Sequence, residues 1–439
     1  MRTFAPTVTN GFASSALRRS VMSAWVLQLA VIGFVAGHAC LPNVWLHLGW
    51  LLLAGSVAIH WLDWTPRLKH LPTDTGCVSA CAFLFWMTAR SCSGAAFTQS
   101  PDMSEILRGI LGLVLLVMFG VLVWQLAQKG DALRLMGWVT GVTSTFAALI
   151  SLVLSYFVLP GHHTGERLTN LLVHGGLNPV CTGLIFGFAS VWLVAQVEKE
   201  PATTPRRLVW AAIVLLQLAA FFTGSRGAML AMVCGHAALW IARGWRRGTK
   251  AACVFIVTGA IYFTSAPLLS RVAQWRSTTE AVATANDITH HFHAAVERGD
   301  NGRLDIYRAG WHAMDHLWCG TGQWGVHEIW QCELQAKGDI TMMSHLHSAF
   351  FATFVHGGII GIGLLLALLG IGVRRACRIA RHDDATWIAL LAFGCGGLLF
   401  DGESLTSLAT APRFEGLLFW LPLTVALARG GPTSPRAGF

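Results

Sequence analysis

Three histidines stand near the start of an apolar stretch, in "MSHLHSAFFATFVHGGIIG" at residues 343–361: His345, His347 and His356. Imidazole titrates near neutral pH, so a histidine at the water edge of a helical bundle suits general-base chemistry. On one continuous helix, His347 and His356 would project from opposite faces about 13 Å apart along the axis, and His345 would again lie opposite His347. The three therefore do not form one cluster. We expect His347, as the first residue of the helix, to be the base, and His356 to be a packed histidine bonded to a neighbour.

Two arginines could bind an anion. Arg226 lies in "FFTGSRGAML", between two apolar stretches, where a cation is costly unless it has a function. The Ser225 hydroxyl, the flanking glycines and the N–H groups of the following helix would complete an anion site. Arg303, in "DNGRLDIYRAGW", is expected in the first turn of a capped helix, where it would reinforce a phosphate receptor. The alternatives are a charge that marks the water boundary at Arg226 and an exposed structural role for Arg303.

A carboxylate accompanies them. Asp401, in "LLFDGESL", is expected at the outer end of an apolar stretch. It could pair with an arginine or steer a substrate, and the alternative is a structural carboxylate at the membrane interface.

Two other motifs are rejected as cofactor or metal sites. "CGTGQWG" at residues 319–325 matches G-x-G-x-x-G but lacks the strand and following helix that a dinucleotide fold requires, so we expect a glycine-rich turn. "THHFH", with His290, His291 and His293, has no carboxylate or cysteine at ligand spacing. We expect neither a metal nor a cofactor.

The elements that position these residues are membrane helices. Of the 439 residues, 54% are hydrophobic and 12% charged, against roughly 25% charged in a soluble domain. A helix of about 20 apolar residues crosses a hydrocarbon core. The predicted spans are residues 20–38, 43–61, 74–91, 105–127, 134–159, 177–196, 207–223, 227–243, 250–267, 346–373, 385–402 and 412–429.

The distribution of Lys and Arg predicts the orientation. Twenty of the 31 basic residues fall in the termini and alternate loops that are cytoplasmic if the N-terminus is inside. The net charge of +9 follows from this orientation and does not indicate nucleic-acid binding. The predicted parts are the first nine helices in 1–266, a periplasmic loop at 267–345, three helices in 346–429, and a cytoplasmic tail at 430–439.

The loop has helical patterns. Apolar side chains recur at helical spacing up to a capping glycine, Gly299, and again over Leu304, Tyr307, Trp311, Met314 and Trp318. A small helical cap with its aromatic residues towards lipid or the bundle top is expected. Cys319 and Cys332 share the loop, and their pairing stays open.

These motifs resemble the O-antigen ligases, within a superfamily that includes O-antigen polymerases and protein O-oligosaccharyltransferases. His347-Ser348 with Gly358 and Gly361 is similar to the family's histidine motif, "TGSRGA" to its Ser-Arg-Gly turn, and the Arg303 helix to its loop helix running into Gly-x-Gly. A proline that commonly precedes that turn is replaced by Trp318-Cys319. The resemblance covers roughly residues 205–405.

The resemblance implies a GT-C-like glycosyltransferase of the bacterial inner membrane, active at the periplasmic face. It would transfer O-polysaccharide from undecaprenyl diphosphate to a sugar hydroxyl of lipid A-core with inversion, and without ATP or metal. His347 would be the base, and Arg226 and Arg303 would hold the diphosphate. An O-antigen polymerase, a protein O-oligosaccharyltransferase and a multi-span transporter are the alternatives. The single large loop favours the ligase over the polymerase, and the short C-terminal tail disfavours the oligosaccharyltransferase.

Overall fold

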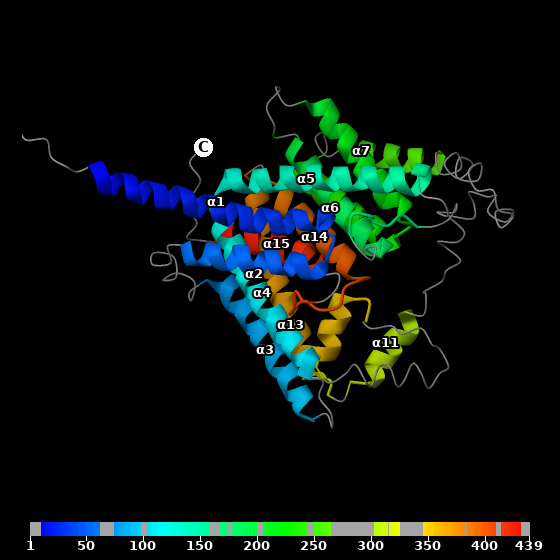
Figure 1. Cartoon of the computed structure of the whole chain (residues 1–439). Helices are drawn as coiled ribbons and strands as arrows, with labels where there is room; N and C mark the ends of the chain where they lie inside the picture. Colours follow the sequence, from blue (N-terminus) through cyan, green and yellow to red (C-terminus); the bar gives the residue numbers. More distant parts are fainter. Residues whose placement is uncertain are drawn as a thin grey trace, which may run out of the picture.

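A computed structural model describes most of the chain: residues 10–61, 74–97, 103–158, 167–173, 178–197, 199, 205–244, 249–250, 252–264, 303–314, 316–324, 346–382, 384–409 and 414–431. Within these ranges the regular structure is helical and includes no β-strand (Figure 1). The chain is an all-α polytopic membrane protein.

The first half of the chain forms α1 (Asn10–Cys40), α2 (Val44–Trp61), α3 (Thr75–Phe97), α4 (Met103–Ala127), α5 (Gly130–Val153) with the π-helical turn η2 (Leu154–Val158), and α6 (Pro179–Val197). The second half forms α7 (Arg206–Phe222), α8 (Arg226–Arg243), an unlabelled helix at Ala252–Thr264, α11 (Arg303–His312), α13 (Ala349–Ala380), α14 (Thr386–Leu398), η4 (Gly416–Trp420) and α15 (Leu421–Arg429).

A helix occupies each of the twelve predicted spans, but not all of these helices reach the length and apolarity of a membrane crossing. Six do: Met22–Cys40, Val44–Trp61, Met103–Ala127, Gly130–Val158, Pro179–Val197 and Ala349–Ala380. α7 and α14 have 17 and 13 residues, and so rise less than the ~30 Å of the hydrocarbon core at about 1.5 Å per residue. The prediction of about twelve helices is confirmed. Six of these helices are long and apolar enough to be membrane spans.

α6 forms the centre of the bundle. Of its best apolar window, 94% is buried, as expected for a helix that is hydrophobic all round. It contacts α5, α7, α8 and α14, and α8 and α14 also pack against each other. On another side of the bundle, α13 lies beside α3 and α15 (Figure 1).

Helix ends that are predicted to lie on the same side of the membrane are joined by ion pairs. Arg375 near the end of α13 bonds Asp74 before α3 at 3.0 Å, and Arg429 after α15 bonds Asp384 before α14 at 3.1 Å. Arg226 and Arg243 stand at opposite ends of α8, about 27 Å apart along its 18 residues. The candidate site therefore lies at the other end of the helices from these ion pairs.

The large predicted loop is described only at residues 303–314 and 316–324. The helix expected before Gly299 and the histidines His290, His291 and His293 lie outside the described residues. Cys332 lies outside them as well, so its pairing with Cys319 stays open. The predicted division of the chain at residues 266, 345 and 429 stays a prediction.

Candidate functional site

His347 does not begin a helix, contrary to the prediction from helical phase. α13 begins at Ala349, and the hydroxyl of its N-cap, Ser348, accepts a hydrogen bond from the Phe351 N–H at 3.2 Å. His347 has a φ of 50°, in the left-handed region that residues other than glycine seldom adopt. Because the chain turns before the helix starts, the direction of the imidazole is set by this turn and not by the phase of α13. Such a backbone costs about 1–3 kcal/mol and persists where surrounding contacts impose it.

The Asp401 carboxylate is one of those contacts. Nδ1 of His347 lies 3.5 Å from Oδ1 of Asp401, and the exposed fractions of the two side chains are 20% and 6%. The same oxygen accepts a hydrogen bond from the Gly402 N–H at 2.9 Å, and the Asp401 carbonyl accepts one from the Ala349 N–H at 3.3 Å. The segment after α14 is thus bonded to the start of α13. The ring of His347 turns Nδ1 towards the carboxylate, with Nε2 on its other side.

α11 covers the histidine from the side of the loop. The Tyr307 hydroxyl donates a hydrogen bond of 3.5 Å to the His347 carbonyl, and its ring stacks at a tilt on Phe351, with centroids 4.8 Å apart. Burial raises the pKa of the Tyr307 phenol, and the Arg303 guanidinium opposes this rise while the Asp401 carboxylate adds to it. Both charges act on Tyr307, so Arg303 belongs to the same site as Asp401.

α11 contains the first three residues of the predicted apolar pattern, Leu304, Tyr307 and Trp311, and ends before Met314 and Trp318. Ile306 and Ala309 of α11 form a small apolar cluster with residues at the start of α13, whereas Leu304 is 54% exposed. Trp318 lies beyond the helix and is 64% exposed. Two bulky residues of the pattern do contact α13: the ring of Tyr307 lies on Phe351, and that of Trp311 stacks on Phe354 with centroids 5.7 Å apart.

Arg226 begins α8 in the predicted tight turn, and its side chain is exposed. The Ser225 hydroxyl caps this helix, accepting a hydrogen bond of 3.2 Å from a backbone N–H three residues on, and Ser225 is buried at 1% exposure. Ser225, whose residue type and place suit either an acceptor-site residue or a structural one, therefore has a structural role as the N-cap of α8. A Cβ on Gly227 would lie 3.8 Å from Cβ of Phe400, the residue before Asp401. The start of α8 and the end of α14 are thus neighbours.

Arg167 is a third arginine at this turn. Its Nε donates a hydrogen bond of 2.6 Å to the Thr223 carbonyl, and its side chain lies 3.7 Å from the position that a Cβ on Gly224 would take. The sequence prediction did not include Arg167, because this residue lies in a short polar loop and not at the edge of an apolar run. A signal was present, since this loop is predicted to be periplasmic, where arginine is disfavoured by the charge bias.

α13 is broken at Gly358, and the glycine-rich turn of the loop fills the break. Gly358 has φ 66° and ψ −165°, outside the helical region. Its two following residues donate backbone hydrogen bonds to the carbonyls of Leu317 and Trp318 at 3.0 and 3.2 Å. In return, the N–H groups of Thr321 and Gly322 bond the carbonyls of the two residues before Gly357, at 3.0 and 2.9 Å. The turn satisfies the polar groups that the break frees.

The span predicted at 346–373 is present as α13 but is interrupted at Gly358, and the predicted glycine turn is confirmed. The His356 imidazole is bonded to a neighbour as expected, with Nδ1 at 3.1 Å from the Gly322 carbonyl oxygen. Arg90 of α3 holds the turn from the other side, donating to the carbonyls of Cys319 at 2.9 Å and Gly320 at 2.5 Å. The sequence provides no signal for Arg90, because its partners are backbone oxygens of a distant segment.

Residues 210–366 match the family described as O-antigen ligase. The matched segment contains the Arg226 turn, α11 with Arg303, the glycine turn, and the broken first part of α13 preceded by His347. This match supports membership of the O-antigen ligase family. Among curated proteins, none matches the sequence. The matched family consists of glycosyltransferase-like ligases and polymerases, whose substrates are lipid-linked polysaccharides.

The O-antigen ligase match does not reach Arg167 or Asp401, so their position in the site rests on the geometry alone. Together the described residues offer a histidine oriented by a carboxylate, next to helix ends that carry arginines. This arrangement can move a proton on one side and bind an anion on the other. Among the described residues, no group of three His, Cys, Asp or Glu side chains is placed to hold a metal ion.

Proposed function

We propose that this chain is an O-antigen ligase in the strict sense. It transfers O-antigen polysaccharide from undecaprenyl diphosphate to a sugar hydroxyl of lipid A-core, at the periplasmic face of the inner membrane and without metal or ATP. The observation that carries the proposal is the His347–Asp401 pair at the start of α13, next to Tyr307, on which the charge of Arg303 also acts.

His347 is the general base. With Nδ1–H donated to Asp401, Nε2 is unprotonated and can accept the proton of the acceptor hydroxyl as its oxygen bonds the anomeric carbon. The carboxylate also stabilises the imidazolium that forms. The separation of 3.5 Å is long for a hydrogen bond, and such pairs commonly tighten when substrate binds.

Arg226 and Arg303 hold the diphosphate. The bond from the anomeric carbon to the diphosphate oxygen breaks with both electrons on that oxygen, and the arginines stabilise the charge that develops there. Arg226 supplies a guanidinium at the start of α8, where the helix N–H groups also favour an anion. Diphosphate leaves readily, so no general acid is required, and direct attack by the hydroxyl inverts the anomeric centre.

Asp401 positions the base in this proposal, and a role in steering the acceptor is secondary. Its side chain is 6% exposed and accepts a backbone hydrogen bond, which suits a fixed partner of His347 better than a group that contacts a bulky saccharide.

The test is transfer by purified protein from lipid-linked polysaccharide to lipid A-core, with EDTA present. Replacing His347 by Ala should lower the rate about 10²–10⁴-fold, the usual contribution of a general base. His382→Ala is the matched control, because this histidine is exposed at the opposite end of α13, and it should transfer normally.

Three results would contradict the proposal. Normal transfer by His347→Ala would show that His347 is not the base. Loss of transfer in EDTA, restored by a divalent cation, would contradict the metal-free mechanism. Elongation of lipid-linked polysaccharide with no transfer to lipid A-core would identify an O-antigen polymerase.

A further inference from the structure

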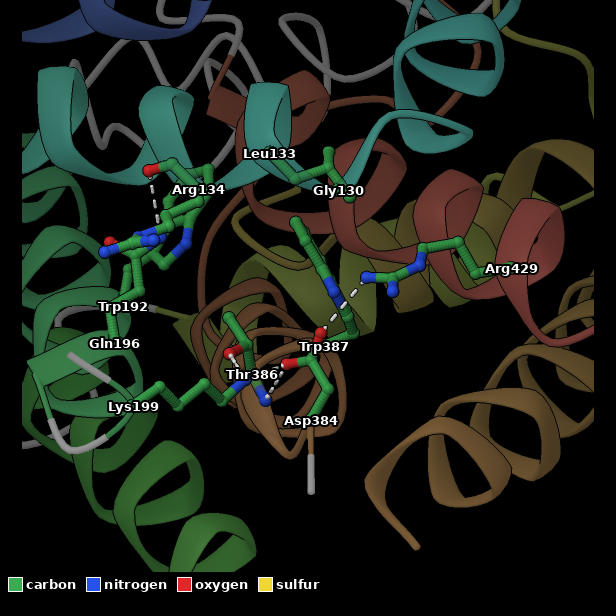
Figure 2. Close-up of a pocket in the computed structure, with 10 residues that line it drawn as sticks. All are labelled: Gly130, Leu133, Arg134, Trp192, Gln196, Lys199, Asp384, Thr386, Trp387 and Arg429. Atoms are coloured by element: carbon green, nitrogen blue, oxygen red, sulfur yellow. Dashed lines mark hydrogen bonds and ion pairs between the residues drawn. The ribbon is translucent and has the colours of Figure 1, made fainter. Parts of the chain in front are cut away.

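A cavity of about 220 Å³ lies at the end of the bundle away from His347. Its walls come from four separate elements: the start of α5, the end of α6 with Lys199, the start of α14, and Arg429 at the end of α15 (Figure 2). These are loop ends that the charge distribution predicts to be cytoplasmic. Pockets for drug-sized ligands measure roughly 300–1,000 Å³, so this one fits a small group and not a saccharide chain.

Three buried polar atoms of the lining have no hydrogen-bond partner. They are the indole Nε1 of Trp192, the indole Nε1 of Trp387 and Oε1 of Gln196. The two tryptophans are only 1% and 2% exposed, and their rings meet edge to face with centroids 5.9 Å apart. Buried N–H donors are normally bonded, so two unpartnered donors in the wall of one cavity point to a ligand with acceptor oxygens.

The charge of the lining favours an anion. Arg134, Lys199 and Arg429 line the cavity with a single carboxylate, Asp384. Lys199 and Arg429 both bond that carboxylate, Arg429 at 3.1 Å, so Asp384 holds the two cations in place without neutralising the set (Figure 2).

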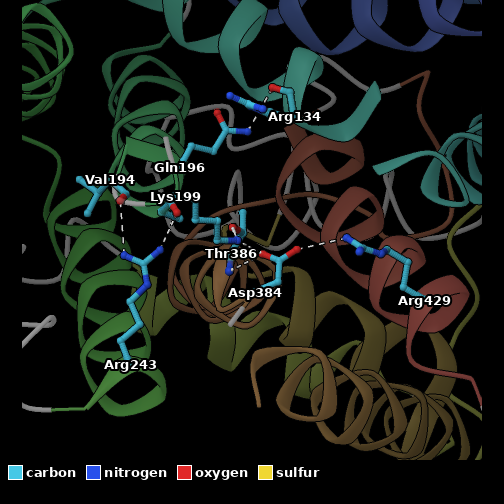
Figure 3. A network of polar contacts seen from close by, with 9 residues as sticks. Arg134, Val194, Gln196, Lys199, Arg243, Asp384, Thr386 and Arg429 are labelled. Carbon is cyan, nitrogen blue, oxygen red and sulfur yellow. Dashed lines mark hydrogen bonds and ion pairs between the residues drawn. The ribbon is translucent and has the colours of Figure 1, made fainter. Parts of the chain in front are cut away.

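The helix dipoles at the cavity also favour an anion. α5 and α14 both begin here, so two positive helix ends lie at the cavity. Carboxylates offset part of this charge, since Asp131 lies in the first turn of α5 and Asp384 accepts a hydrogen bond from the Thr386 N–H at 3.3 Å. The end of α6 would oppose the two helix ends, but Arg243 of α8 donates to the carbonyls of Val194 and Ala195 and offsets its negative charge (Figure 3).

We propose that this cavity binds a phosphate ester that carries a hydroxyl, such as a glycerophosphate group. The cations and the indole N–H groups bind the phosphate oxygens, and Gln196 Oε1 accepts a hydrogen bond from the hydroxyl. The same chemistry is offered by the head group of an anionic phospholipid and by a soluble glycerol phosphate. The site is separate from the proposed transfer site, so either proposal can fail without the other.

The test measures the thermal unfolding of the full chain in detergent, titrated with phosphatidylglycerol, phosphatidylethanolamine or soluble glycerol 1-phosphate. Trp387→Phe keeps the ring and removes one donor, and Arg429→Gln removes one charge. Arg374→Gln is the matched control, an exposed arginine near the same end of α13 but outside the cavity.

We expect phosphatidylglycerol to raise the unfolding temperature more than phosphatidylethanolamine. Trp387→Phe and Arg429→Gln should each weaken its binding by about tenfold, as expected for a lost hydrogen bond to a charged group, while Arg374→Gln binds like the wild type. Arg429→Gln can also disturb the ion pair with Asp384. If the two variants give different results, the result of Trp387→Phe therefore decides the test.

An equal response to soluble glycerol 1-phosphate would support the site and identify a soluble ligand, whereas a response to phosphatidylglycerol alone would identify a lipid. The proposal is overturned if neither compound stabilises the protein, or if Trp387→Phe responds like the wild type. It is also overturned if Arg374→Gln loses as much affinity as Arg429→Gln, because binding would then reflect surface charge.

Discussion

Replacing Gly358 by alanine should expel the glycine turn from the break in α13. A Cβ at this position would lie 2.3 Å from the carbonyl carbon and oxygen of Trp318 and 2.5 Å from the Cys319 nitrogen. These are backbone atoms that cannot swing aside. Withdrawal of the turn would break the four backbone hydrogen bonds across the break. At about 1 kcal/mol each, the loss is about 4 kcal/mol, a large part of the roughly 5–15 kcal/mol that stabilises a typical protein.

The assay is thermal unfolding in detergent together with transfer activity. Gly363→Ala is the matched control, since nothing lies within 4 Å of its added Cβ, and alanine there should stabilise the helix by up to about 1 kcal/mol. We expect Gly358→Ala to unfold at a clearly lower temperature and to lose transfer, because the turn holds the loop that covers His347. A Gly358→Ala protein as stable and active as Gly363→Ala would refute this reasoning.

Three further predictions concern single side chains. Asp401→Asn should lower the transfer rate by about 10²-fold at unchanged unfolding temperature, because it removes the charge that orients the base; an unchanged rate in kinetic assays would speak against the pair. Arg167→Gln should raise the KM for the lipid-linked donor by about tenfold with a smaller change in kcat, since it loosens the Thr223 turn, and an unaltered KM would exclude a role for it. Burial alone would raise the pKa of Asp384, but Lys199 and Arg429 outweigh burial and lower it. The ion pairs therefore stabilise the fold above about pH 4 and are lost as the pH falls below it. The unfolding temperature of the wild type should drop more between pH 5 and pH 3 than that of Asp384→Asn, and parallel curves would contradict this.

The helices could be predicted from the sequence because their signal is local. Each apolar run contains a helix, and the capping turn at Ser225 and Arg226 follows from residue types that are adjacent in the chain. The glycine turn at residues 319–325 could also be predicted, because closely spaced glycines favour turns that need positive φ. Gly320 and Gly322 adopt such angles, 67° and 79°.

The break in α13 could not be predicted in this way. "VHGGIIG" reads as an ordinary apolar helix, and glycine is common in membrane helices. An interrupted helix is stable in a membrane only if the backbone groups that it frees have hydrogen-bond partners. Here those partners are the carbonyls and N–H groups of residues 317–322, which belong to a separate segment of the chain. The left-handed backbone of His347 and its pairing with Asp401 are tertiary features for the same reason.

The break at Gly358 also joins both parts of α13 to the outer loop. Val355 and His356, before the break, accept hydrogen bonds from the glycine turn, and Ile359 and Ile360, after it, donate to the same turn. Residues 349–357 also pack against α11 through apolar contacts. A change in the tilt of either part of α13 therefore moves the glycine turn, and with it the loop helix that lies over His347.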